Sequence, residues 1–270
     1  MIQKKVMFES AAAAVCLMGA LLAGCGRSAA DFDVLAVSRP DGNGVDIDAL
    51  IEEYRVVPVH SDSLLIGELV SVVQRDSVLY SLDAYGTLVL TSLNSEKTIF
   101  IRNLSGQGPG ECIQPQALAV DSNYVYVYDL GRMSISCYSV DSLEFKKQIQ
   151  VDVPSMSIAA SASKLAVASL DLREGAPQIV EVDVAGGDTT AYCHIPERCE
   201  ISYALAPPAV YAYGDSFFFT SLWNNVFNEI DATTGEVTSK LIRFDGFSDN
   251  GGSSRMSVHD DSAAEERPVV

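Results

Sequence analysis

The chain has 270 residues, with 18 basic and 36 acidic side chains and a formal net charge of −18 at pH 7. An acidic surface of this kind repels phosphate backbones, so the composition argues against nucleic acid as a partner. The length is sufficient for one all-β domain with an ample core, and no second domain is needed.

The N-terminal segment has the features of an export signal. Two lysines precede an apolar run at residues 11–22, which is too short to cross a membrane as a helix. The run ends in LAGC at residues 22–25, which resembles the lipobox of bacterial lipoproteins. This resemblance implies that residues 1–24 are removed and that Cys25 carries lipid. The alternative is an ordinary signal peptide with a chance cysteine.

The rest of the chain divides by composition. Residues 25–53 are turn-rich and weakly periodic, which predicts a tether between the lipid and the folded body. Residues 54–245 carry the β patterns of the folded body. Residues 246–270 are rich in Gly, Ser and Asp, and we expect a disordered tail. The expected location is the bacterial envelope, with the outer membrane favoured and its periplasmic or surface face left open.

Two β patterns flank a Gly/Pro-rich connection. Alternating and β-branched residues at 98–102 and 124–128 predict strands. The sequence GQGPGE between them predicts a turn-rich connection. Its turn-forming residues are Gly106, Gly108, Pro109, Gly110 and Glu111.

Two series of strand-ending residues repeat along the folded body. The first series is Asp83, Asp129, Asp171 and, in the acid's place, Trp223, with intervals of 46, 42 and 52 residues. The second series is Asn94, Asp141, Asp183 and Asp231, with intervals of 47, 42 and 48 residues. A period of about 46 residues with about four short strands per unit predicts the blades of a β-propeller. The recurrent acids are interpreted as turn formers and not as a ring of metal ligands, so no metal is expected.

The chain resembles the six-bladed β-propeller lipoproteins of gut Bacteroidetes, which are related to NHL-repeat propellers. The resemblance covers residues 54–245 and depends on the segments at 54–59 and 65–69, the GQGPGE turn and the blade anchors. It implies a six-bladed ring in which the strand at 55–60 completes the final blade. Cys112 follows the turn where such proteins usually carry an aromatic residue.

The folded body is long enough for about four blades of this period, which predicts a member of the family shortened at its C-terminus. A closed ring of four or five blades is the alternative. An incomplete ring would leave blade faces without a partner, because each blade buries its faces against both neighbours.

The cysteines and histidines give no clear metal or catalytic site. Cys112, Cys137, Cys193 and Cys199 remain after signal removal and lipidation. A disulfide between Cys193 and Cys199 is favoured. Zinc bound through these two and His194 fits known ligand spacings poorly, and unpaired thiols stay possible. His60, His194 and His259 lie in different segments.

The sequence indicates binding more than catalysis. It contains none of the usual nucleophile, phosphate-loop, dinucleotide or zinc-protease motifs, and we assign no catalytic residue and no cofactor. The candidate binding residues near strand ends are Arg102, Arg132, Arg173, Tyr85 and Trp223. We expect a module for a glycan, peptide or partner protein. The alternative is a propeller lyase or hydrolase, which convergence of His60, His194, Glu111 and Asp171 in one funnel would indicate.

Overall fold

The computed structural model describes residues 33–38, 55–59, 64–196, 208–221 and 226–245. Nearly all of them belong to one compact unit, residues 34–256. Their regular structure consists of seventeen β-strands and no helix, which confirms the predicted all-β class for this part of the chain. In these segments, accordingly, no helix is long and apolar enough to cross a membrane.

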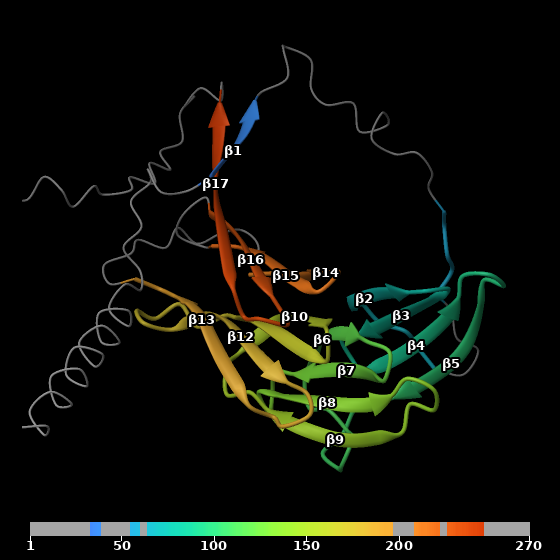
Figure 1. The fold of residues 1–270 in the computed structure, drawn as a ribbon. Coiled ribbons are helices and arrows are strands. Elements are labelled where there is room, and N and C mark those ends of the chain that lie inside the picture. The colour runs from blue at the N-terminus through green and yellow to red at the C-terminus, as the bar shows by residue number, and fades with distance from the viewer. Residues whose placement is uncertain (1–32, 39–54, 60–63, 197–207, 222–225, 246–270) are drawn as a thin grey trace, which may run out of the picture. The chain divides into compact units, whose positions relative to one another are not determined.

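The strands form four sheets, which we call blades 1 to 4 in chain order (Figure 1), and the pairings among β2 to β17 are antiparallel. Blade 1 contains β2 (Leu69–Arg75), β3 (Val78–Asp83), β4 (Thr87–Ser92) and β5 (Lys97–Asn103). Blade 2 contains β6 (Pro115–Val120), β7 (Tyr124–Asp129), β8 (Ser134–Ser139) and β9 (Phe145–Gln150). Blade 3 contains β10 (Ser155–Ser161), β11 (Lys164–Ser169), β12 (Pro177–Asp183) and β13 (Thr189–His194). Blade 4 contains β14 (Val210–Tyr213), β15 (Ser216–Thr220), β16 (Val226–Asp231), β17 (Val237–Asp245) and, beyond β17, β1 (Asp33–Ser38).

The N-terminal strand differs from the expectation. β1 lies within the segment predicted to be a tether, and it extends blade 4 at its β17 edge. Residues 55–59, which were expected to complete a blade, form no strand, and His60 lies outside the described residues. The Arg55 guanidinium instead donates a hydrogen bond of 2.6 Å to Glu96, in the turn between β4 and β5. This segment therefore contacts blade 1.

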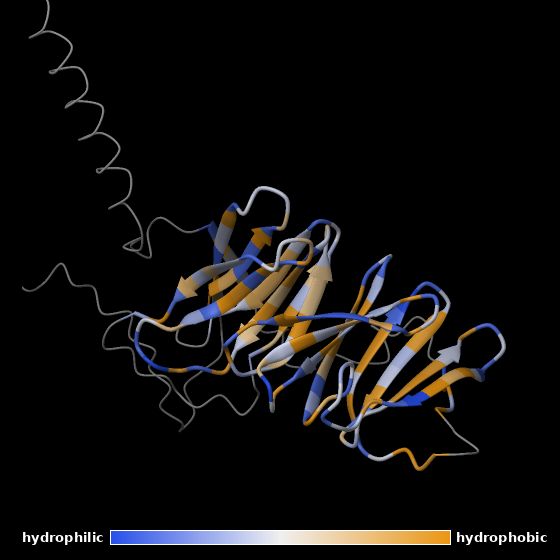
Figure 2. Cartoon of the chain, turned by 90° about the horizontal axis from the view of Figure 1, so that it is seen from below, coloured by the Kyte–Doolittle hydropathy of each residue, from blue (hydrophilic) through white to orange (hydrophobic). Residues whose placement is uncertain are grey.

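Each blade packs against the next through an apolar layer. Alternation along each strand sends successive side chains to opposite faces, so one sheet can contribute to two layers. In Figure 2 apolar residues recur along the strands and hydrophilic residues recur in the turns. The layer between blades 1 and 2 includes Tyr80, Leu82, Val127 and Tyr138. The layer between blades 3 and 4 includes Ala166, Ile179, Phe217 and Ile230.

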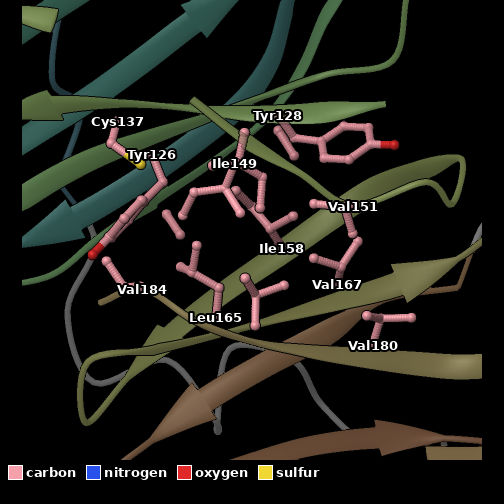
Figure 3. Packing of buried hydrophobic residues seen from close by; sticks show 14 residues of the cluster. Tyr126, Tyr128, Cys137, Ile149, Val151, Ile158, Leu165, Val167, Val180 and Val184 are labelled. Atoms are coloured by element: carbon pink, nitrogen blue, oxygen red, sulfur yellow. The ribbon is translucent and has the colours of Figure 1, made fainter. Parts of the chain in front are cut away.

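The layer between blades 2 and 3 is shown in Figure 3. Tyr126 and Ile149 from blade 2 point toward Leu165 and Val167 from blade 3, and all four are buried. At about 25 cal/mol per Å² of apolar surface, each fully buried side chain of this size stabilises the fold by roughly 1.5–3 kcal/mol. Packing between blades therefore stabilises the propeller more than any single polar contact does.

Serine hydroxyl groups form a second kind of link between neighbouring blades, from the first strand of one blade to the first strand of the next. The first strands of blades 1 and 3 each contain an irregularity, and Ser71 and Ser157 directly follow it. The Ser71 hydroxyl accepts a hydrogen bond of 3.0 Å from the N–H of Leu118, and the Ser157 hydroxyl accepts one of 3.1 Å from the N–H of Val210. Blade 2 has Ala117 at the equivalent place, so the layer between blades 2 and 3 has no such link.

The first predicted anchor series is correct for two blades and wrong for the third. Asp83 and Asp129 end the second strands of blades 1 and 2, where they pair with the first residues of β2 and β6. In blade 3 the equivalent pair is Ser155 with Ser169, so Ser169 and not Asp171 is the equivalent residue. The strand β11 ends at Ser169, so Asp171 is the second residue of the loop that follows it.

The second anchor series is correct in blades 3 and 4 and is displaced by two residues in blades 1 and 2. The turn between third and fourth strands closes where the carbonyls of Ser92, Ser139, Asp183 and Asp231 accept the N–H four residues on. These donors are Glu96, Leu143, Gly187 and Gly235, and all four have positive φ, between 52° and 77°. The second series thus marks a recurring turn geometry, which begins at a serine in blades 1 and 2 and at an aspartate in blades 3 and 4.

Candidate functional site

One end of the propeller carries the longer connections, and we call it the loop end. In an antiparallel meander, successive connections alternate between the two ends of a sheet. The loop end therefore collects the loop between the second and third strands of each blade and the connection from each blade to the next. The opposite end carries the remaining, mostly tighter turns.

Two buried carboxylates hold the loops of blades 1 and 2. Asp83 has no exposed surface, and its oxygens accept hydrogen bonds from the N–H groups of Gly67, Tyr85 and Thr87 at 2.7–2.9 Å. Asp129 is equally buried. It accepts from the N–H groups of Ile113, Gln114 and Gly131 at 2.9–3.0 Å. These contacts confirm the structural interpretation of the two acids, because main-chain donors occupy their oxygens.

The GQGPGE sequence forms the predicted turn. The Glu111 side chain folds back and accepts a hydrogen bond of 2.7 Å from the N–H of Gly108. A Cβ atom at Gly106 would lie 2.0 Å from Glu111 Oε2. Gly110 has φ +72°, and a Cβ atom there would lie 2.6 Å from the Cβ of Phe145. The two glycines are thus required by space and by backbone conformation.

Two of the predicted binding arginines support this turn. The Arg132 guanidinium donates to the carbonyl of Glu111 and lies 3.7 Å from Asp129. The Arg102 guanidinium donates to the carbonyl of Leu143 at 2.6 Å and lies over the Tyr138 ring. The Tyr138 hydroxyl in turn donates to the carbonyl of Gly110 at 2.9 Å. Because one donor of each guanidinium is engaged by a main-chain carbonyl, the geometry gives these arginines a positioning role.

The other predicted binding residues do not form one cluster. Tyr85 is 69% exposed on the β3–β4 loop, with its ring so close to Gly67 that a Cβ atom there would lie 2.5 Å from it. Arg173 is exposed on the β11–β12 loop and forms a two-pronged ion pair with Asp171 at 2.5–3.1 Å. Trp223 lies outside the described residues. Blade 2 therefore separates the exposed candidates of blades 1 and 3.

Exposed apolar side chains follow the loop end across three blades. Tyr85 is joined by Ile113, Met133 and Met156, which are 53%, 39% and 44% exposed. We call these four residues the loop-end row. They project from the β3–β4 loop, the connection to blade 2, the β7–β8 loop and the start of β10.

Main-chain hydrogen bonds connect the segments that carry the row. The N–H of Leu104 donates to the carbonyl of Gly86, next to Tyr85, and Asp129 fixes the N–H of Ile113. The carbonyl of Met133 accepts from the N–H of Val151, on the connection to blade 3. Sequence reasoning missed three of the four residues, because an isolated Ile or Met in a loop carries no motif. For Ile113 and Met133, positions close to predicted turns were the one available signal.

The two buried cysteines are not activated as nucleophiles. Burial raises the pKa of the Cys112 thiol and raises that of Cys137 to about 12, so neither forms a thiolate nucleophile at neutral pH. Cys193 has φ +53° in β13, whereas Cys199 lies outside the described residues, so their disulfide stays a prediction.

The convergence that would have indicated an enzyme is not seen among described residues. His194 lies in β13, and His60 lies outside the described residues. The Glu111 carboxylate is engaged by Gly108, and the ion pair with Arg173 holds the pKa of Asp171 below its usual range. A general acid needs the opposite shift, toward neutral pH. No group of three or more metal-ligating side chains is present in the described part either.

Four-stranded antiparallel sheets that pack face to face in chain order, with loops gathered at one end, define a β-propeller. Residues 34–246 match the family DUF5128, described as a 6-bladed beta-propeller. Since the match covers most of the chain, the chain belongs to this family. The predicted six-bladed relationship is confirmed at this level, whereas the lipoprotein and NHL-like character stay predictions.

Among solved structures, the chain is similar to a "Putative exported protein" of Bacteroides fragilis, with a TM-score of 0.63 and 18% identity. The similarity covers 78% of this chain and 61% of that chain, so the chain spans about three fifths of that protein's length. AztD from Citrobacter koseri follows with a TM-score of 0.49, 15% identity, and 68% and 50% coverage. At 18% identity, the likeness to the Bacteroides fragilis protein establishes the fold alone. No curated protein matches the chain.

Proposed function

We propose that the protein is an exported binding module of the bacterial envelope, attached to the membrane by lipid on Cys25, and that its loop-end row binds a peptide or protein partner. The observation that carries the proposal is the exposure of four apolar side chains along adjoining, internally anchored segments. A rigid β scaffold that presents binding groups on loops is a common arrangement of binding proteins.

The chemistry of the row favours a polypeptide over a glycan. Glycans stack on flat aromatic rings, and Tyr85 is the one aromatic residue among the four. Ile and Met side chains instead provide adaptable aliphatic contacts, which suit the side chains of a peptide or protein surface. The positioning of Ile113 by the buried Asp129 carboxylate lowers the entropy that binding would otherwise cost.

Export and lipid attachment are supported from two sides. The LAGC sequence resembles a lipobox, and the similar Bacteroides fragilis protein is named as exported. A lipid anchor would leave the folded body in water near the membrane. The acidic composition, with a net charge of −18 over the full sequence, would keep that body apart from anionic lipid headgroups, so the expected partner is not the bilayer itself.

The proposal is tested by selecting ligands on the purified chain from a displayed peptide library and, in parallel, on a glycan array. We expect peptides with apolar side chains, and we expect Ile113→Ser with Met133→Ser to abolish their binding. Ile99→Ser is the matched control, because Ile99 is 55% exposed on β5 and lies outside the row. Peptide binding that survives the double variant, or glycan binding in its place, would overturn the assignment.

A further inference from the structure

Exposed acidic side chains accompany the loop-end row across the same three blades. Three of them are exposed on segments that adjoin the row, and we call them the acidic border: Glu68, Asp152 and Glu174. Glu68 directly precedes β2, Asp152 lies on the connection from blade 2 to blade 3, and Glu174 lies on the β11–β12 loop. Each of the three blades therefore contributes to both the apolar row and the acidic border.

Main-chain contacts hold two of these acids beside residues of the row. The carbonyl of Glu68 accepts a hydrogen bond of 2.8 Å from the N–H of Ala84, the residue before Tyr85. The N–H of Asp152 donates to the carbonyl of Met133 at 3.3 Å. A carboxylate thus stands on the segment next to Tyr85, and another stands on the segment next to Met133.

The third acid lies on a loop that begins beside the last residue of the row. The N–H of Leu170, at the start of the β11–β12 loop, donates to the carbonyl of Pro154 at 2.8 Å. Pro154 is two residues before Met156, and Glu174 follows on the same loop as Leu170. The apolar row and the acidic border therefore run along adjoining segments up to blade 3.

Two arginines of the loop end are already neutralised within the protein. The Arg132 guanidinium lies 3.7 Å from the buried carboxylate of Asp129. The Arg173 guanidinium forms its ion pair with Asp171 at 2.5 Å. Because each of these cations is matched by an acid of its own, neither neutralises the acidic border.

The carboxylates of the border remain available to a partner. Glu68 and Glu174 form no ion pair with any residue that the structure describes. The Asp152 carboxylate accepts a hydrogen bond of 2.8 Å from the Gln150 amide, which is neutral. The charge that the loop end presents to a partner is therefore negative, and it lies beside exposed apolar side chains.

We propose that the polypeptide bound by the loop-end row is basic, with Lys or Arg side chains between its apolar ones. This inference rests on the function proposed above and specifies its partner. The aliphatic stem of a Lys or Arg side chain covers apolar surface while its charged head stays in water. Such a stem can pack on Tyr85 or Met133 while the head reaches the neighbouring carboxylate. Charge complementarity of this kind also attracts the partner from a distance and excludes acidic competitors.

Fluorescence anisotropy with three labelled synthetic peptides tests the inference on the purified chain. The peptides have about twelve residues, share the same leucines, and carry lysine, glutamine or glutamate at the other positions. We expect the lysine peptide to bind at least about tenfold more tightly than the glutamate peptide. Its affinity should fall about threefold or more between about 50 and 300 mM NaCl, because salt screens exposed charges. The affinity of the glutamine peptide should not depend on salt.

A border variant with Glu68→Gln, Asp152→Asn and Glu174→Gln removes the three charges and keeps the shape of each side chain. It should bind the lysine peptide about fivefold or more weakly, since one exposed ion pair contributes up to about fivefold in affinity. Its affinity for the glutamine peptide should be unchanged. This second reading separates a lost charge from a damaged loop end, which would weaken both peptides.

A matched control variant removes the same number of charges elsewhere. Its substitutions are Asp141→Asn, Asp188→Asn and Glu236→Gln, at exposed positions in the turns between third and fourth strands, away from the loop end. The control and border variants have equal net charge, so their difference reports the local effect alone. The control should lose less than about twofold in affinity for the lysine peptide.

A charge reversal gives a result that a poorly folded protein cannot produce. Glu68→Lys with Glu174→Lys should make the chain prefer the glutamate peptide over the lysine peptide. Equal affinity for the three peptides, or equal losses in the border and control variants, would overturn the basic partner and leave the row as a peptide site. Absence of binding by all three peptides would overturn this inference together with the function on which it rests.

Discussion

Replacement of Asp129 by alanine tests how the loop end is held. The side chain has no exposed surface and accepts three main-chain hydrogen bonds, from Ile113, Gln114 and Gly131. A hydrogen bond to a charged group contributes about 1.5–3 kcal/mol when its loss leaves a buried donor without a partner. Here the three donor residues lie at an exposed loop end, where water can replace part of the loss. We therefore assign about 1 kcal/mol to each bond and about 3 kcal/mol to the substitution.

The assay is urea unfolding followed by circular dichroism, with a thermal melt alongside. A loss of about 3 kcal/mol should lower the Tm by roughly 6–12 °C for a domain of this size. Asp129→Ser should lose about half as much, because the short Ser169 hydroxyl serves the equivalent place in blade 3. Asp141→Ala, an exposed acid in the same blade, is the control and should change stability by less than about 0.5 kcal/mol. An Asp129→Ala protein as stable as the control would refute the reasoning.

Three further outcomes follow from other features. Gly110→Ala and Gly175→Ala both place a side chain at positive φ, but only Gly110 has Phe145 within 2.6 Å of the new Cβ, so Gly110→Ala should lose at least about 1 kcal/mol more in the same urea assay. Burial raises the pKa of the Cys137 thiol to about 12, so the folded chain resists ionisation that the unfolded chain undergoes near pH 8.5. The stabilisation that this shift provides should be fully present below that pH and should be lost as the pH rises toward 12. Ellman's reagent should react with Cys112 and Cys137 only in denaturant, and rapid labelling of either of these two thiols in the native chain would contradict this. Cys25→Ser should end incorporation of labelled fatty acid without changing the β-type circular dichroism, and continued incorporation would exclude the lipobox assignment.

The sequence was sufficient to predict the blade and insufficient to predict its exact register. Strand content and the GQGPGE turn follow from local rules, namely alternation of apolar residues and clusters of glycine and proline. Asp83 and Asp129 were also identified correctly as turn formers. Asp171 was not equivalent to them, because a hydroxyl at Ser169 can end the strand and the sequence does not show where a longer loop begins.

The candidate site was harder to predict because it depends on which donors remain available after folding. Arg102 and Arg132 had the chemistry of ligand-binding groups, yet carbonyls of Leu143 and Glu111 engage them. Ile113 and Met133 carry no recognisable motif in the sequence. Only the fold shows that both side chains stay exposed, on segments that are neighbours at the loop end. β1 was missed for a related reason, since a short strand at a sheet edge needs a partner from the far end of the chain.

The alanines between blades 3 and 4 determine the order in which the protein comes apart. Ala159, Ala166, Ala168 and Ala232 are four of the nine buried residues of this cluster, whereas Ala117 and Ala119 are two of the fourteen in the cluster between blades 2 and 3. Each missing methylene forgoes about 0.8 kcal/mol of burial, and units in a repeating array are coupled mainly to their neighbours. Blade 4 should therefore detach before the others, with amide hydrogens of β15 and β16 exchanging with solvent sooner than those of β7 and β8. Under heat or mechanical load, the protein would thus lose the packing of blade 4 while the loop-end row of blades 1 to 3 is still intact.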